Sequence, residues 1–159
     1  MAAKTGVLTI GLAPHPANYI LNVPQAEKLG QEHATGAVLQ LSSGYLIGST
    51  TGTLSTGYGI AMEAGHDTVA DGEVRASIYR FKQGEMVEGT MEGTFAQTDI
   101  GLEATIAQAA GGIPTFTQAG SSGTFRIIGL APGWNVGDTN ARIFAIPMDS
   151  FIEQGGGNE

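Results

Sequence analysis

The sequence predicts a mainly β fold, a compact antiparallel β-barrel or β-sandwich with an extended N-terminal arm and little helix. Short apolar, β-branched runs of strand length recur along the chain, and turn-forming residues bound each of them. Glycine accounts for 25 of the 159 residues and cysteine is absent, so packing rather than disulfide bonds must hold the fold. Hydrophobic residues make up 42% of the chain, which is enough for a domain of this length to bury a core.

Residues 1–24 are predicted to form the arm. Thr5–Leu12 has the composition of a strand, and Pro14 and Pro16 then exclude helix and remove backbone N–H donors. A short apolar run, Tyr19–Val23, follows and ends at another proline. An apolar, extended segment of this kind needs a surface to lie on, which is its own domain, a neighbouring subunit or a different protein.

Residues 25–152 are predicted to form a single β domain, and residues 153–159, which include a run of glycines, a flexible C-terminal tail. A helical turn or two is expected over Pro24–Leu29, because proline suits the first helical position and a glycine follows. The strands expected after it are Ala37–Leu41, Tyr45–Ile47, Gly59–Met62, Glu73–Phe81, Met86–Met91, Leu102–Gln108, Ile113–Thr117, Gly123–Leu130 and Asn140–Ile146. Short strands at this regular spacing are typical of a barrel or a sandwich.

Local patterns support particular elements of this prediction. Alternating side chains make Glu73–Phe81 the clearest strand, with Val74, Ala76 and Ile78 on one face. Ser42-Ser43-Gly44 is expected to be a three-residue hairpin loop, with glycine in the left-handed conformation. Gly48–Gly57 is rich in serine, threonine and glycine and is expected to be a loop.

The charge pattern excludes several classes of partner. The formal net charge is −8, and the seven lysines and arginines are dispersed, so no basic cluster is present to bind nucleic acid. An anionic membrane surface is disfavoured for the same reason, and no apolar run approaches the length of a membrane span. Only 14% of the residues are charged, so the surface relies on neutral polar side chains, which suits close packing in an assembly.

Candidate catalytic side chains form no recognisable constellation, so we expect no enzyme activity and no catalytic residue. The three histidines, His15, His33 and His66, lie beside prolines or in polar loops, which favours solvated surface positions over a role as a base. The segment Asp138-Thr139-Asn140 is similar to the Asp-Thr-Gly of aspartic proteases but ends in asparagine. A side chain that caps a turn before the last strand is the simpler interpretation.

Metal and cofactor binding are not expected either. A loop with His66, Asp67, Asp71 and Glu73 carries the oxygen ligands that Ca²⁺ prefers, but it lacks the spacing of an EF-hand and is interpreted as an acidic turn. The acidic residues Glu85, Glu88 and Glu92 are interpreted as an exposed strand face rather than a glycosidase pair. No glycine-rich loop is followed by a helix, so a phosphate-binding site is unsupported.

Segments rich in glycine and aliphatic residues resemble the capsid decoration proteins of tailed bacteriophages. The resemblance is carried by Gly36–Ile47, an apolar strand, glycine turn and return strand, and by Gly57–Glu63, with its Gly-Ile-Ala strand. It continues in Val74–Phe81, Met86–Gly89, Phe125–Gly133 and Val136–Ile143 and covers about half of the chain. The first 24 residues match no pattern of this family.

The resemblance implies a non-enzymatic structural protein of the virion, located on the outer surface of the capsid. Its expected partners are the major capsid protein and further copies of itself in a homotrimer, and it would stabilise the expanded shell by bridging coat subunits. The residues expected to make these contacts are Val7, Leu8, Ile10, Leu12, Tyr19, Ile20 and Leu21 in the arm, and Trp134 in a turn.

Other functions remain open at the level of the sequence. Another virion component, such as a head-fibre base or a tail protein, would share this β-rich composition. A carbohydrate-binding β module would use Trp134 as its exposed aromatic side chain. An enzyme on a trimeric β scaffold, such as a nucleotide hydrolase, would need a carboxylate–metal site that these residues do not suggest.

Overall fold

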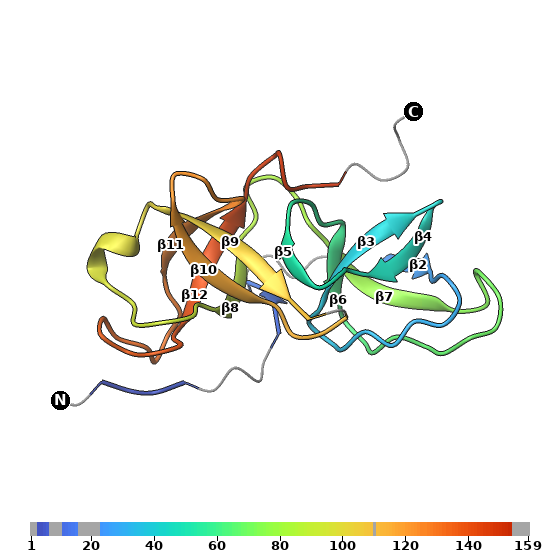
Figure 1. Cartoon of the computed structure of the whole chain (residues 1–159), viewed down its shortest axis with the longest axis horizontal. Coiled ribbons are helices and arrows are strands. Elements are labelled where there is room, and N and C mark those ends of the chain that lie inside the picture. The colour runs from blue at the N-terminus through green and yellow to red at the C-terminus, as the bar shows by residue number, and fades with distance from the viewer. Residues whose placement is uncertain (1–2, 7–10, 16–22, 110, 154–159) are drawn as a thin grey trace.

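A computed structural model describes residues 3–6, 11–15, 23–109 and 111–153 (Figure 1). The chain is mainly β and forms two antiparallel sheets, which lie side by side along the long axis of the molecule. The predicted fold class is confirmed in its sandwich-like form, since neither sheet closes into a continuous barrel within the described residues. The helical content of those residues is the short 3₁₀ segment η2, Gln97–Asp99.

The larger sheet has seven strands and holds most of the second half of the chain. Its order is β1 (Ala13–Pro14), β8 (Val87–Thr90), β12 (Arg142–Pro147), β11 (Phe125–Leu130), β9 (Glu103–Gln108) and β10 (Thr115–Gly120), and β5 (Gly52–Leu54) also pairs with β9. A parallel bridge between Met91 and Phe116 brings the chain after β8 beside β10, so the sheet is strongly curled. The strand β5 lies inside a segment that the sequence predicted to be a loop.

The smaller sheet has five strands in the order β2 (Val23–Ala26), β7 (Arg75–Arg80), β6 (Gly59–Ala61), β3 (Val38–Ser42) and β4 (Tyr45–Gly48). The helical turn expected over Pro24–Leu29 is wrong, because this segment enters the sheet as β2 and pairs with β7. Proline is compatible with this position because β2 is an edge strand. Gly44 has a φ of 83°, as expected for the hairpin between β3 and β4.

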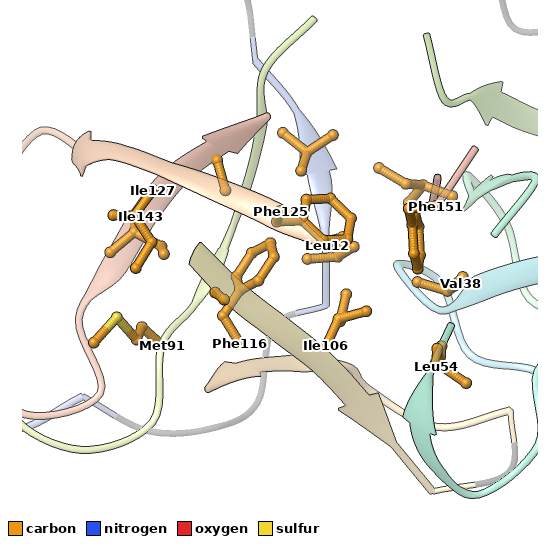
Figure 2. Close-up of a cluster of buried hydrophobic side chains, with 14 of the residues drawn as sticks. Leu12, Val38, Leu54, Met91, Ile106, Phe116, Phe125, Ile127, Ile143 and Phe151 are labelled. Atoms are coloured by element: carbon orange, nitrogen blue, oxygen red, sulfur yellow. The ribbon is translucent and has the colours of Figure 1, made fainter. Parts of the chain in front are cut away.

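A single large hydrophobic core joins the two sheets. The ring of Phe125 on β11 lies 5.1 Å from that of Phe116 and 4.6 Å from that of Phe151, measured between centroids (Figure 2). Phe81, at the end of β7, contacts Phe151 at 5.4 Å and belongs to the same core. A second, smaller cluster that includes Leu39, Leu46 and Ile78 lies within the five-stranded sheet.

Candidate partner-contact site

The first described residues of the arm lie on a turn of the large sheet, residues 133–140. Thr5 forms a parallel bridge with Thr139. The Gly6 N–H donates to the carbonyl of Thr139 at 2.7 Å, and the Thr139 N–H donates to the carbonyl of Lys4 at 2.8 Å. Backbone groups thus attach the arm, while the side chains of Lys4 and Thr5 stay exposed to solvent.

The side chain of Asp138 also holds the arm on the turn. One carboxylate oxygen accepts the backbone N–H of Lys4 at 2.5 Å, and the other accepts that of Asn135 at 2.7 Å. These two hydrogen bonds, the one from Lys4 first, hold the pKa of Asp138 below its usual value. The prediction that Asp138 caps a turn is therefore confirmed, although the arm as well as the turn supplies its donors.

Trp134 is half-buried between the arm and the core. The Lys4 ammonium lies 3.9 Å from the centroid of the indole ring and donates to the carbonyl of Gly133 at 3.0 Å. A Cβ at Gly6 would come within 2.7 Å of the indole, so the arm passes over the ring with no room for a side chain. Two residues farther along the turn, Val136 is 50% exposed and adds an apolar side chain to the surface beside the arm.

A second part of the arm is built into the fold. Leu12 is 3% exposed within the large core, and its N–H donates to the carbonyl of Gly36 at 2.9 Å. The following strand β1 pairs with β8. Arg142 donates through Nη2 to the carbonyl of Gly11 at 3.2 Å while its Nε donates to Glu88 Oε1 at 2.6 Å.

The structure therefore places two of the predicted contact residues, Leu12 in the core and Trp134 under Lys4. The others lie outside the described residues: Val7, Leu8, Ile10, Tyr19, Ile20 and Leu21. Their contact with a partner stays a prediction. Val136 was not predicted as a contact residue. The sequence signal that could have identified it is an apolar residue between Asn135 and Gly137 in a polar turn.

Two of the three histidines belong to a polar cluster that the sequence did not predict. The expectation of a solvated surface position is wrong for His33, whose residue is 2% exposed. Its Nε2 lies 3.5 Å from Glu27 Oε1, and the other oxygen of this fully buried carboxylate lies 3.0 Å from His66 Nδ1. His66 is 40% exposed in its side chain and also lies 3.5 Å from Glu63. Burial lowers the pKa of His33, and the nearby Glu27 opposes this shift.

The other acidic candidates hold turns and strands together. Asp71 accepts the backbone N–H of Leu29 at 3.0 Å, and Glu73 accepts that of Val69 at 3.2 Å. Glu92 accepts the Thr115 hydroxyl at 2.7 Å. Across the part of the chain that the structure describes, no group of three or more His, Cys, Asp or Glu side chains is arranged to hold a metal ion.

Tyr79 makes a short hydrogen bond to Glu85 across the turn that joins β7 and β8. Burial, together with this carboxylate, raises the pKa of the Tyr79 hydroxyl. The bond closes the β7–β8 turn and leaves Glu85 with a structural partner.

No helix among the described residues is long and apolar enough to cross a membrane. Comparison of the chain with protein-family models, with curated proteins and with solved structures found no match.

Proposed function

We propose that this chain is a structural protein of a phage virion that binds the outer surface of the capsid and stabilises the expanded shell by bridging coat subunits. The observation that carries the proposal is the surface formed by residues 3–6 and the 133–140 turn. There backbone hydrogen bonds hold the arm on the turn, and residues 3–5 and Val136 are exposed to solvent.

The segments that resemble decoration proteins support this proposal through their place in the fold. Strands β3, β6 and nearly all of β4 lie within Gly36–Ile47 and Gly57–Glu63. Strand β11 lies within Phe125–Gly133. The resemblance therefore extends over strands of both sheets. The expected homotrimer belongs to the same proposal.

A mechanism of stabilisation follows from linkage. A protein that binds only the expanded shell stabilises that shell by RT ln(1 + [L]/Kd), which is about 2.7 kcal/mol per site at a hundredfold excess over Kd. Many copies on one lattice would add avidity to weak single contacts. An extended arm can also add a strand to a coat-protein sheet, where backbone hydrogen bonds give affinity with little demand on sequence.

The carbohydrate-binding alternative gains no support from the geometry. Such a module needs an open aromatic face, whereas the Lys4 ammonium lies over the Trp134 ring. A hollow of about 200 Å³ beside the arm is lined by residues without titratable side chains: Gly11, Leu12, Ala13, Pro14, Thr35, Gly36, Ala61 and Met62.

Co-sedimentation with empty expanded capsids of the parent phage tests the proposal. The full chain should co-sediment, and a variant that lacks residues 1–10 should not, although it keeps Leu12 and strand β1 and should remain folded by circular dichroism. Failure of the full chain to bind would overturn the proposed function.

A matched pair of surface variants tests the contact surface itself. Val136→Asp should weaken capsid binding at least tenfold, whereas Val69→Asp should not, although Val69 is 88% exposed. The control is apt because the 62–74 loop and the 131–141 turn lie at opposite ends of the molecule (Figure 1). Equal loss of binding in the two variants would reject the assignment of the surface.

A further inference from the structure

One buried carboxylate, Glu27, lies between two imidazoles. Its Oε2 accepts the backbone N–H of His66 at 3.2 Å and lies 3.0 Å from His66 Nδ1. Its Oε1 faces His33 Nε2 at 3.5 Å, and both side chains are fully buried. Glu27 therefore contacts both imidazoles, of which only that of His33 is fully buried.

The two histidines differ in their surroundings. His66 is partly solvated and has Glu63 as a second acidic neighbour. By contrast, neither ring nitrogen of His33 has a hydrogen-bond partner, and Glu27 Oε1 also lacks one. A proton on His33 would therefore place a charge on a fully buried ring that makes no hydrogen bond.

Backbone hydrogen bonds join the segment that begins at His33 to several other parts of the chain. Its carbonyl accepts the N–H of Gly65 at 2.8 Å, and the next residue, Ala34, donates to Gly111 at 2.8 Å. Gly36 donates to Ala61 at 2.7 Å and accepts from Leu12 of the arm at 2.9 Å. A Cβ at Gly11 would come within 2.7 Å of the Gly36 carbonyl, so the two backbones are in direct contact there.

We propose that the Glu27–His33–His66 cluster is an acid-operated latch. In the closed state residues 31–36 keep their backbone hydrogen bonds; protonation of His33 breaks these bonds and thereby frees the Gly11–Leu12 stretch of the arm, which is the open state. The titratable groups that face His33 are Glu27 at the end of β2, and His66 and Glu63 from the loop after β6. Gly48 and Gly111, which lie against the backbone and Cβ of His33, carry no side chain, and Glu32 is exposed to solvent.

The direction of the pH effect follows from burial. The pKa of His33 is lowered from its ordinary value of 6.5 in the closed state, so the open state binds more protons. The closed state has its full stability above about pH 6.5 and loses it as the pH falls below that value. One proton taken up on opening changes the opening equilibrium by at most about tenfold per pH unit.

Amide hydrogen exchange followed by NMR from pH 7.5 to 4.5 tests the latch. The results are compared as protection factors, which remove the intrinsic pH dependence of exchange. The protection factors of Leu12, Ala34 and Gly36 should fall by up to about tenfold per pH unit below pH 6.5. Ile127, which donates to Leu102 within the large sheet, should keep its protection and serves as the internal reference.

His33→Gln should abolish this pH dependence, whereas His15→Gln, at a histidine outside the cluster, should preserve it. An unchanged slope in His33→Gln, or a flat profile in the wild-type chain, would overturn the latch. If His33→Gln does not fold, nitrogen-detected titration of the wild-type rings decides. The His33 ring should gain its proton only as protection is lost; protonation without loss of protection would refute the proposal.

Discussion

Arg142 and Glu88 form an ion pair at 2.6 Å across strands β12 and β8, and the same guanidinium reaches the carbonyl of Gly11 at 3.2 Å. The side chains are only 11% and 24% exposed. This arginine therefore connects two neighbouring strands to the Gly11 end of the arm.

Replacement of this arginine should loosen both the sheet and the arm. Arg142→Gln removes charge-assisted hydrogen bonds from a partly buried position and should lower the free energy of unfolding by about 1.5–3 kcal/mol in urea titrations. Arg126→Gln is the matched control, because Arg126 is 50% exposed and lies 3.4 Å from Glu103. Its effect should stay below about 1 kcal/mol. Equal losses in the two variants would contradict the role assigned to Arg142.

Gly6 should accept no side chain while the arm lies on the turn. Gly6→Ala is expected to displace residues 3–6 from Trp134, because the added Cβ would overlap the indole and the Asn140 backbone. The protein has a single tryptophan, so its fluorescence should report the displacement directly, by a red shift and greater quenching by iodide. Gly129→Ala, where a Cβ meets nothing within 4 Å, should leave the spectrum unchanged.

Phe151 should be a major stabilising residue despite its place near the C-terminus. It is fully buried against Phe81 and Phe125, so it attaches the last described segment to both sheets. Phe151→Ala should lower the free energy of unfolding by about 3–5 kcal/mol. Ile128→Ala, at a residue that is 39% exposed, should cost much less in the same denaturation experiment.

Asp138 should make the attachment of the arm depend on pH. Its pKa is lowered in the folded state, so its contribution is present above the ordinary value of 3.8 and is lost as the pH falls through the lower folded value. Asp138→Asn should therefore reduce stability at pH 7, and the difference from wild type should disappear in strong acid. Asp67→Asn, at an exposed loop position, should show no comparable difference.

Local sequence patterns were sufficient wherever a segment is governed by its neighbours in the chain. The alternation in Glu73–Phe81 predicted β7, and the Ser-Ser-Gly loop predicted the hairpin in which Ser43 and Gly44 both have positive φ. Local patterns failed where a distant segment of the chain determines whether a residue joins a strand. Pro24 joins an edge strand because β7 offers it backbone partners, and the segment after Gly48 forms β5 because β9 does.

The sequence by itself determined the mainly β class, the positions of most strands and turns, and the turn-capping role of Asp138, since each depends on side-chain alternation or on local backbone geometry. Only the tertiary structure decided that Leu12 lies in the core and that Glu27 and His33 meet out of contact with water. The physical reason is that burial and electrostatic environment are set by residues far apart in the chain, which come together only when the two sheets pack on a common core.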